Sequence, residues 1–577
     1  MMLFRPHPSD PASRILLFAS IFIFPTALYF ILWNKITLIQ WEILTSPATP
    51  IFFPVILDGK GLLLSSVVLF ISANVICFAK SYMGKDPFVN RFTHLVLLFV
   101  LSMNMLIYFP HLMTLLLGWD GLGLVSFILV IYYQNPKSLG AGMITALTNR
   151  IGDVMLLLAI AWSINQGHWS ILHMSLDSSL SNLVTLSILI AAITKSAQMP
   201  FSSWLPAAMA APTPVSALVH SSTLVTAGVF LLIRFFPFLS SVNWFQPVLL
   251  FIATITMLMA GISAMTECDL KKIIALSTLS QLGVMMASLG LGLPTLALFH
   301  LMTHALFKAL LFLCAGTIIH LFSHSQDLRA VGNLMNQMPL TMTCLLIANM
   351  ALCGSPFLAG FYSKDLILEL SLYNPTNSLI LILFFFATAL TAAYSLRFML
   401  TALLAPMNST PMMNTNDEDT TITTPMSFLA LAAISSGAMM NWILLPFDLE
   451  PLLPTSLKTL ALLVTATGAI LTYYVYTPLQ TSQTTLISNT TSHEASSFMW
   501  YLTPLSSQGS LKYPLTASHL LLKSTDQAWL ETTGGQGIHV MLSNMSTMIQ
   551  PMQNNTINKF LHMSTLLIIP LIIMFIF

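Results

Sequence analysis

Long apolar segments recur along the whole chain, and they constrain its fold more than any other feature. Most are close to the roughly 20 residues that an α-helix needs to cross the hydrocarbon core of a bilayer. Strand patterns between them are weak, which favours helices over a membrane barrel. The sequence therefore predicts an all-α polytopic membrane protein with about 15 transmembrane helices, if each broken segment crosses once. The segments fall near residues 13–33, 61–80, 90–108, 111–133, 140–163, 182–211, 213–236, 246–263, 270–292, 295–322, 340–373, 378–404, 426–446, 457–477 and 558–577.

The composition excludes several classes of protein. Of the 577 residues, 56% are hydrophobic and only 7% are charged, which does not fit a soluble globular fold. The 21 basic and 20 acidic residues nearly cancel, so no basic surface for nucleic acid is expected. The cysteines are scattered singly, without a CxxC pair or a Cys/His spacing suited to zinc or an iron–sulfur cluster. We therefore expect no metal or redox cofactor in this chain, whose five cysteines are Cys77, Cys268, Cys314, Cys344 and Cys353.

The positions of the basic residues predict the orientation of the chain. When the segments are threaded alternately across the membrane, 13 of the 21 Lys and Arg residues fall on the side of the N-terminus and four on the other side. Basic residues prefer the cytoplasm-like side, which for a mitochondrion is the matrix. We therefore expect the N-terminus on the matrix side. The remaining four basic residues lie inside predicted spans: Arg150, Lys195, Lys308 and Lys364.

Two polar segments separate the last spans. Residues 405–425 carry an acidic run at 417–419 and are expected to form a solvated loop. Residues 478–557 are rich in Ser, Thr, Gln and Asn but also contain apolar residues at intervals, which indicates an amphipathic helix at an interface or against a partner. A folded cap over the spans is the alternative. A single unbroken helix is not expected there, because three glycines interrupt the pattern: Gly534, Gly535 and Gly537.

A weak internal repeat divides the spans into two halves. The motifs MPFSSWLPA at 199–207 and SPFLAGFYS at 355–363 each place Pro-Phe in the middle of a long apolar segment, 156 residues apart. Helices broken at corresponding positions of two halves are typical of inverted repeats with a site near the bilayer midplane. We therefore expect, in order, N-terminal spans, a first inverted repeat, a second inverted repeat, one additional span, the polar segment and an anchor span, over residues 1–110, 111–236, 246–446, 457–477, 478–557 and 558–577.

Three charged residues lie inside the fourth and fifth predicted spans. Asp120, in GWDGLGLVS, is surrounded by apolar residues, so it either has a cationic partner or hydrogen-bonds a helix end beside its glycines. Arg150 and Asp153, in NRIGD, are three residues apart and therefore share one face of a helix. We expect them to form an ion bridge, which is either purely structural or leaves Arg150 as a second partner for Asp120.

Residues 194–228 place a lysine and a histidine inside a long apolar stretch that four prolines interrupt. An ionisable group at membrane depth is costly and usually has a task. The protonation of Lys195 can change when a carboxylate moves closer or away, so this residue can hold and release a proton. A lysine whose long side chain reaches the interface is the alternative. His220 is either an ordinary core residue or part of a hydrated track among the neighbouring Ser and Thr residues.

The segment HLMTHALFKALLFLCAG carries a stripe of titratable residues. His300, His304 and Lys308 recur at intervals of four, so they lie on one face of a helix. Such a stripe favours proton relay, with structural packing as the alternative. It is a weak signal for zinc, because no glutamate follows the first histidine and no third ligand is evident. Lys364 and Asp365, in GFYSKD, mark either the exit of a proton path or the membrane interface.

Five motifs resemble, in order and spacing, those of the antiporter-like subunits of respiratory complex I. They are GWDGLGLVS, NRIGD, the stretch 194–228, HLMTHALFKALLFLCAG and GSPFLAGFYSKD. The resemblance covers residues 50–400 well and the C-terminal part loosely. It implies two inverted five-helix repeats with one broken helix each, a long lateral helix on the matrix side that braces neighbouring pump subunits, and a final span.

The resemblance also implies a proton pathway through the charged residues. In such subunits the acid at the position of Asp120, commonly a glutamate, is paired with the lysine at Lys195, and the arginine at Arg150, next to Asp153, competes for it. The other pathway residues link the two halves and lead protons toward the positive side of the membrane; they are His220, His300, His304, Lys308, Lys364 and Asp365.

The function implied is that of a proton-translocating core subunit in the membrane arm of complex I, in the mitochondrial inner membrane. NADH, FMN, iron–sulfur clusters and ubiquinone are then expected in other subunits. The expected partners are other membrane-arm subunits, especially the neighbouring antiporter-like subunit, accessory subunits, and phospholipids such as cardiolipin. A stand-alone cation/proton antiporter of the same superfamily and a non-conducting scaffold subunit remain as alternatives. A membrane-embedded hydrolase is not favoured, because the predicted loops offer no nucleophile–base pair.

Overall fold

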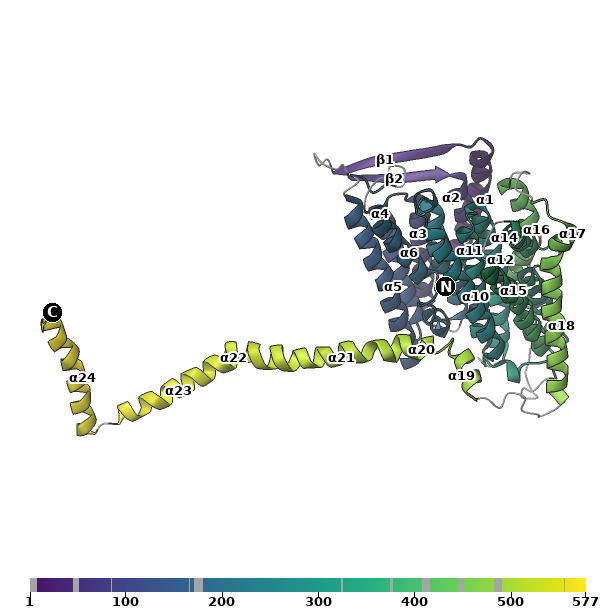
Figure 1. The fold of residues 1–577 in the computed structure, drawn as a ribbon. Helices are drawn as coiled ribbons and strands as arrows, with labels where there is room; N and C mark the ends of the chain where they lie inside the picture. Colours follow the sequence, from purple (N-terminus) through teal and green to yellow (C-terminus); the bar gives the residue numbers. More distant parts are fainter. Residues whose placement is uncertain are drawn as a thin grey trace, which may run out of the picture. The chain divides into compact units, whose positions relative to one another are not determined.

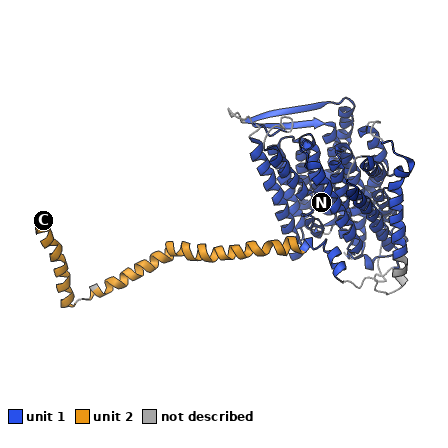
Figure 2. Cartoon of the chain, viewed as in Figure 1, with its two compact units in different colours: residues 1–503 blue, residues 504–577 orange. Residues whose placement is uncertain are grey.

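The computed structural model describes residues 8–44, 51–84, 86–164, 167–170, 180–322, 325–373, 377–406, 416–445, 451–481, 490–554 and 556–576. The chain divides into two compact units, Met1–Thr503 and Pro504–Phe577, coloured blue and orange in Figure 2. The first unit contains most of the apolar helices. The second contains a long helical segment and the last apolar helix.

The first unit is a bundle of helices (Figure 1). Its N-terminal half contains α1 (Ser9–Leu32), α2 (Gly59–Tyr82), α3 (Val89–Tyr108), α4 (Leu112–Val130), α5 (Pro136–Ser163), α6 (Ser181–Lys195), α7 (Trp204–Ala207), η3 (Ala208–Ala210), α8 (Thr213–Val215), η4 (Ser216–Thr223) and α9 (Leu224–Leu239). Its C-terminal half contains α10 (Phe245–Thr266), α11 (Leu270–Gly290), α12 (Pro294–Leu321), η5 (Leu328–Ala330), α13 (Pro339–Cys353), α14 (Ala359–Tyr373), α15 (Ser378–Met399), η6 (Leu400–Leu404), α16 (Thr420–Leu444), α17 (Thr455–Lys458), α18 (Leu460–Thr481) and α19 (Thr490–Ser497).

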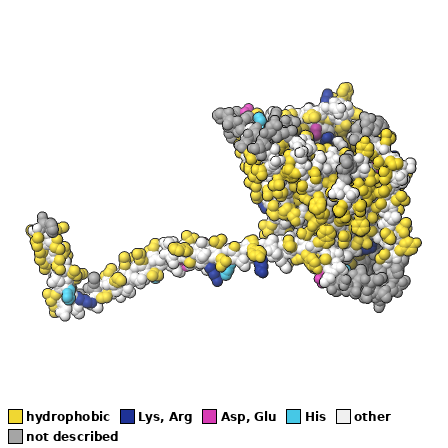
Figure 3. All heavy atoms as spheres, viewed as in Figure 1, with side chains coloured by type: hydrophobic (Ala, Val, Ile, Leu, Met, Phe, Trp, Pro, Cys, Tyr) yellow, Lys and Arg dark blue, Asp and Glu magenta, His cyan; other side chains and the backbone are white. Residues whose placement is uncertain are grey.

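Most of these helices suit a bilayer. Across the described residues of both units, 12 helices are long and apolar enough to cross a membrane, and three shorter apolar helices accompany them: Ser181–Lys195, Pro339–Cys353 and Leu460–Val475. The predicted class, a polytopic helical membrane protein, is thereby confirmed, whereas the exact number of spans stays a prediction. In Figure 3, hydrophobic side chains dominate the visible face of the bundle, as expected for a surface that contacts lipid.

The centre of the first unit is formed by helices that are buried on all sides. The most apolar stretch is completely buried in α11 and in α12, and it is 89% buried in α2. In α1 and α5 the corresponding stretches are only 17% and 28% buried. A helix that is apolar all round packs inside a protein. The polar side chains of α12 are therefore surrounded by protein rather than by lipid.

One short sheet interrupts the helical pattern. Strands β1 (Ile36–Leu44) and β2 (Ile51–Asp58) form an antiparallel hairpin between α1 and α2, with Ile36 opposite Asp58. The sequence does not predict this hairpin, because β1 reads ITLIQWEIL and its apolar residues occupy both faces. The expected all-α chain therefore carries a small β element, and its outer strand leaves Trp41 76% exposed.

An ion pair fixes the end of this hairpin to the bundle. The Arg234 guanidinium donates to both oxygens of the Asp58 carboxylate, at 2.6 and 2.7 Å, and to the carbonyl oxygen of Ile107 at 3.1 Å. Asp58 also accepts a hydrogen bond from the backbone N–H of Gly61 and thus caps α2. Two-pronged Arg–carboxylate pairs are strong and directional. The hairpin, α2, α3 and α9 are therefore joined at one point.

The two halves of the first unit repeat the same helix pattern. Helices α11, α12 and α13 begin 158 residues after α4, α5 and α6, respectively. α5 and α12 contain 28 residues each, and α6 and α13 contain 15 each. Both shorter helices end a few residues before a proline, Pro200 or Pro356, which confirms the two repeats with a broken helix that the Pro-Phe motifs predict.

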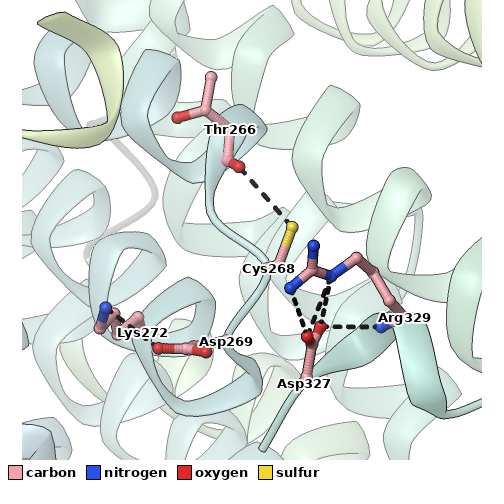
Figure 4. A network of polar contacts seen from close by, with 6 residues as sticks. All are labelled: Thr266, Cys268, Asp269, Lys272, Asp327 and Arg329. Carbon is pink, nitrogen blue, oxygen red and sulfur yellow. Dashed lines mark hydrogen bonds and ion pairs between the residues drawn. The ribbon is translucent and has the colours of Figure 1, made fainter. Parts of the chain in front are cut away.

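Each repeat is closed at the same place by an isolated β-bridge. His111, just before α4, pairs with Ser170, and Asp269, just before α11, pairs with Asp327. Beside the second bridge, Arg329 donates to the Asp327 carboxylate from Nε at 3.1 Å and from Nη2 at 2.6 Å (Figure 4). This hydrogen bonding holds the pKa of Asp327 below its ordinary value. The matching bridges are a second sign of the repeat.

The predicted loop at 405–425 is shorter than expected. Residues 407–415 lie outside the described part of the chain, and α16 already begins at Thr420. In the acidic run, the Asp417 carboxylate accepts hydrogen bonds from the backbone N–H groups of Leu340 at 3.0 Å and Thr341 at 3.1 Å. These groups belong to the first turn of α13, where N–H groups have no partner within the helix. Asp417 therefore acts as a cap for α13.

The second unit is helical almost throughout. α20 (Leu502–Pro504), η8 (Leu505–Gly509), α21 (Ser510–Leu521), η9 (Leu522–Trp529) and α22 (Leu530–Thr533) follow one another directly, and α23 (Gly535–Gln553) and α24 (Ile557–Ile576) complete the unit. At Gly534 the backbone leaves helical geometry, with φ −99° and ψ −137°. The helix predicted for 478–557 is thus confirmed from Leu502 onward, together with its interruption at the glycines. Residues 482–489 lie outside the described part.

Candidate functional site

The first broken helix places a lysine in the interior of the bundle. α6 ends at Lys195, the chain turns through Ala197 with φ +54°, and helix resumes only at Trp204. Pro200, inside this break, has no N–H group with which to continue the helix. The Trp204 indole donates to the carbonyl oxygen of Thr194 at 3.0 Å and so satisfies one acceptor at the open end. Lys195 is fully buried, at the negative end of the α6 dipole.

Trp119 of α4 holds this lysine. The Lys195 ammonium donates to the carbonyl oxygen of Trp119 at 2.6 Å, and its Nζ lies 4.3 Å from the centroid of the indole ring. The indole Nε1 in turn donates to Oδ1 of Asp153 at 2.8 Å. Trp119 has no exposed surface. A carbonyl dipole and an aromatic face both stabilise a cation, so Lys195 is held by a neutral residue that is itself fixed by a carboxylate.

The predicted bridge between Arg150 and Asp153 is confirmed. Nη1 of Arg150 lies 3.4 Å from Oδ2 of Asp153, one turn apart on α5. The Arg150 side chain is 57% exposed, whereas the Asp153 side chain is 12% exposed. Asp153 therefore links an outward-facing cation to the buried indole of Trp119, with one carboxylate oxygen for each partner.

The pairing between Asp120 and Lys195 that the family resemblance implies is not formed in this structure. No ion pair within 4.0 Å joins Asp120 to Lys195 or to Arg150, all of which are described residues, and Oδ1 of Asp120 is buried without a hydrogen-bond partner. The neighbouring carbonyl, that of Trp119, takes the ammonium instead. A buried acceptor without a partner is costly, which sets Asp120 apart from the other carboxylates of this site.

His220 lies in a stretch of π-helix, η4, and is almost completely buried. Neither ring nitrogen has a hydrogen-bond partner. The hydroxyl groups expected to form a hydrated track around it turn instead to their own helix: Ser222 and Thr223 both donate to the carbonyl oxygen of Leu218. Buried imidazole nitrogens usually have a hydrogen-bond partner, so His220 differs in this respect from an ordinary core histidine.

The stripe on α12 is buried along its whole length. His300, His304 and Lys308 are at most 1% exposed, and the two imidazole rings lie 6.2 Å apart. His300 is bonded on both sides, by the Ser363 hydroxyl at 2.9 Å and by Oε1 of Gln281 at 3.2 Å. Both ring nitrogens of His304 lack a partner. The metal alternative is weakened, because the nitrogens of His300 are already engaged.

Lys308 and Lys364, two of the buried lysines in the second half, are held by hydroxyl groups. Lys308 donates to Oγ of Ser277, and Lys364 donates to Oγ1 of Thr391 at 2.8 Å. Lys364 is 2% exposed and follows Ser363 directly, so it lies next to the residue that bonds His300. Among the described residues, no ion pair within 4.0 Å joins Lys364 to Asp365. Adjacent helical residues point about 100° apart, which accounts for this separation.

Several functional contacts are made by uncharged residues that the motifs do not single out. These residues hold the buried cations and the first histidine: Trp119, Ser277, Gln281, Ser363 and Thr391. Sequence reasoning misses them because Ser, Thr and Gln are common in helices. A signal existed for two of them, since Trp119 adjoins Asp120 and Ser363 adjoins Lys364.

No cofactor site is evident in the described part of the chain. Groups of three His, Cys, Asp or Glu side chains that could hold a metal ion do not occur among those residues. The cysteines there are present as free thiols, scattered as the sequence indicates. The arrangement brings buried lysines, histidines and carboxylates together, and these are side chains that can hold a proton.

Two family models match consecutive parts of the chain. The model described as NADH:quinone oxidoreductase/Mrp antiporter, TM, matches residues 110–391, and the model described as NADH dehydrogenase subunit 5 C-terminus matches residues 394–575. A solved structure of the Mrp complex from Dietzia sp. DQ12-45-1b has a chain with a TM-score of 0.73 and 23% identity. The match covers 98% of this chain and 59% of that one, and it supports the fold.

Relatives named NADH-ubiquinone oxidoreductase chain 5 match over nearly their whole length. The one from Lumbricus terrestris is 57% identical over 545 residues, which is 94% of either chain. The one from Anopheles gambiae is 48% identical, again over 94% of both chains, and the one from Mus musculus is 37% identical over 89% of this chain and 84% of that one. The resemblance inferred from the motifs is thereby confirmed, and the chain belongs to the NADH-ubiquinone oxidoreductase chain 5 family.

Proposed function

We propose that this chain is a proton-translocating core subunit of the membrane arm of respiratory complex I. Membership of the chain 5 family supports this function. The observation that carries it is Lys195, a fully buried lysine at the end of a broken helix that is held by a carbonyl and an aromatic ring. A cation held by neutral groups can exchange them for a nearby carboxylate, and its affinity for a proton changes when it does so.

A small movement of α4 or of the Lys195 side chain would exchange one partner of Lys195, Trp119, for another, Asp120. In the described state it is bound to Trp119, while Oδ1 of the adjacent Asp120 has no partner. When the Asp120 carboxylate replaces the Trp119 carbonyl, the ammonium form is favoured and a proton is held. When the carboxylate moves away, the buried ammonium becomes costly and the proton is released. Arg150 and Asp153 stabilise the position of Trp119 during this exchange.

The remaining pathway residues continue toward the second break. The path runs from His220 to His304 on α12, where Lys308 lies one turn further along the helix. It continues through His300, on the turn before His304, to Ser363. Ser363 is followed in the chain by Lys364 and Asp365. The unpartnered nitrogens of His220 and His304 mark the points where internal water is required. We assign this order of residues to the transfer of protons between the halves.

The inverted repeats supply the framework for this transfer. We propose that residues 111–236 and 246–446 form the two antiporter-like repeats, preceded by spans in 1–110 and followed by an additional span at 457–477. The segment 478–557 braces neighbouring subunits from the matrix side, and 558–577 anchors it. The common offset of 158 residues between corresponding helices supports the division.

The chain acts as part of a larger enzyme. Hydride transfer and quinone reduction occur in other subunits, which hold NADH, FMN, iron–sulfur clusters and ubiquinone. The neighbouring antiporter-like subunit, accessory subunits and phospholipids such as cardiolipin are its partners. The complex lies in the mitochondrial inner membrane, with the N-terminus of this chain on the matrix side, as the distribution of basic residues supports.

Replacing Lys195 tests the function. The Lys195→Ala variant, assembled in complex I and reconstituted in proteoliposomes, is expected to pump fewer protons per electron than the wild type. Lys60→Ala is the matched control, since Lys60 is exposed at the start of α2 and is not one of the residues assigned to the proton pathway. An unchanged proton-to-electron ratio in the assembled Lys195→Ala complex would favour the scaffold alternative. Isolation of the chain without iron–sulfur subunits would favour a stand-alone antiporter.

A further inference from the structure

A hollow of about 430 Å³ lies outside the residues assigned to the proton pathway. It opens between the start of α5, the start of α11 and the segment that follows the first break. Its volume is within the range of small-molecule sites. The lining includes three lysines and two tyrosines: Lys137, Lys271, Lys272, Tyr82 and Tyr133.

Two of these lysines have no acidic partner. Lys271 is 4% exposed, and its ammonium donates to the carbonyl oxygen of Ala211 at 3.0 Å, which uses one of its three donors. Lys137 is exposed, and no hydrogen bond or ion pair of its side chain occurs among the described residues. The charge of Lys137 acts on Lys271, so the two cations repel each other across the hollow. An anion between them would relieve both costs.

The third lysine is already neutralised. The Lys272 ammonium lies 3.0 Å from a carboxylate oxygen of Asp269 and 3.8 Å from one of Glu267. Both of these acids are therefore paired with Lys272. Among the described residues, no carboxylate lies within ion-pair distance of Lys137 or Lys271, although the charge of Asp86 acts on Tyr82 and Tyr133 in the same lining. The excess positive charge of the lining is therefore located at Lys137 and Lys271, on one side of the hollow.

Two long helices also direct their positive ends toward the hollow. α5, with 28 residues, begins at Pro136, and α11, with 21 residues, begins at Leu270. Asp269, the residue before α11, makes no side-chain cap hydrogen bond. Residues from the first turns of both helices line the hollow. The first turn of α5 is closed by a capping box between Asn135 and Ser138, so the start of α11 is the end whose dipole can favour an anion and add to the effect of the two lysines.

We propose that this hollow binds a phosphate group, either in the headgroup of an anionic phospholipid or as free phosphate. Lysines, hydroxyl groups and helix N-termini are the donors that phosphate oxygens prefer. The other wall is apolar and includes Pro206, Met209 and Ile319, which suits the glycerol and first methylenes of a lipid. Because Lys271 also holds the Ala211 carbonyl, a bound phosphate would steady the segment after the first break. The inference does not rest on the proposed pumping function.

Lipid crosslinking in the assembled complex tests this site. The complex is placed in nanodiscs with photoactivatable phosphatidylglycerol or phosphatidylcholine, and the crosslinked peptides are identified by mass spectrometry. Peptides containing 133–138 and 206–211 are expected to react several times more with the anionic lipid. The Lys137→Gln variant should lose about five-fold of that preference, the contribution of one lysine near a lipid phosphate, whereas Lys137→Arg should keep it. Lys60→Gln, an exposed lysine at the start of α2, is the control.

The outcomes separate the two sources of phosphate. A lipid headgroup is supported if the peptides prefer the anionic lipid and millimolar inorganic phosphate does not reduce this crosslinking. Free phosphate is supported if inorganic phosphate reduces the crosslinking at these peptides and not at others. Equal reaction with both lipids, unchanged in Lys137→Gln and insensitive to phosphate, would overturn the proposal. Crosslinks from these peptides to acidic residues of another subunit would also overturn it, because the hollow would then be filled by protein.

Discussion

The contact between Trp119 and Lys195 gives the sharpest test of the proposed exchange. In Trp119→Phe the aromatic face remains, but the indole N–H that donates to Asp153 at 2.8 Å is lost. A hydrogen bond to a charged group contributes about 1.5–3 kcal/mol, which corresponds to about a 10- to 150-fold change in an equilibrium. The ring would lose its fixed position, and the ammonium that lies 4.3 Å from it would shift toward the carboxylates.

The expected result is slower coupled turnover. A lysine paired permanently with a carboxylate releases its proton less readily, so NADH oxidation in coupled proteoliposomes should fall by about ten-fold or more. Asp153→Asn should have a similar effect, because it weakens the same hydrogen bond from the other side. Asp153→Asn also weakens the bridge to Arg150, but the two substitutions share the contact between Trp119 and Asp153, so the double variant should be little worse than Asp153→Asn alone.

A matched tryptophan provides the control. Trp169 is also buried, and its indole donates to the carbonyl oxygen of Ile160 at 3.1 Å, away from the buried lysines. Trp169→Phe should leave coupled turnover close to that of the wild type. The reasoning is refuted if Trp119→Phe pumps and turns over normally, or if the losses in Trp119→Phe and Asp153→Asn multiply in the double variant.

Three further predictions concern other parts of the first unit. Asp58→Asn leaves the Arg234 guanidinium without its carboxylate, so the complex should lose about 3–5 kcal/mol of local stability and melt at a lower temperature in a thermal-shift assay. Asp120→Glu adds one methylene and should allow direct pairing with Lys195, so turnover should be retained, whereas Asp120→Asn should lower the proton-to-electron ratio. Asp327 has a lowered pKa in the folded state, so its contribution to stability is present at neutral pH and is lost as the pH falls through that pKa. Cleavage of η5 by pepsin, which is active at low pH, should accelerate in that range relative to the Asp327→Asn variant, which should show no such step.

The breaks in the helices could be predicted from the sequence because they depend on local chemistry. Pro200 and Pro356 cannot continue a helix, and both helices end before them. The Pro-Phe spacing of 156 residues also lies close to the 158 residues that separate the corresponding helix starts. The hairpin at β1 and β2 could not be predicted, since the nine residues of β1 do not alternate: apolar residues occupy both faces of the strand, with Thr37, Gln40 and Glu42 among them.

The partners of the buried lysines depend on packing that the sequence does not contain. Asp120 and Trp119 are neighbours in α4, yet only the rotation of α4 against α6 decides which of them meets Lys195. The same holds for Ser277 and Thr391, which are two hydroxyl residues among many until they lie next to Lys308 and Lys364. The charged residues of the candidate site could therefore be identified, but their neutral partners could not.

The complete burial of α12 has a consequence for how this chain can change over generations. A side chain on α1 or α5 faces the membrane along much of the helix, so one apolar residue can replace another at little cost. On α12 every side is in contact with protein, and a change of a single methylene is felt by several neighbours. Substitutions that are neutral should therefore collect on the outer helices. The inner helix should change slowly even at positions that carry no charge.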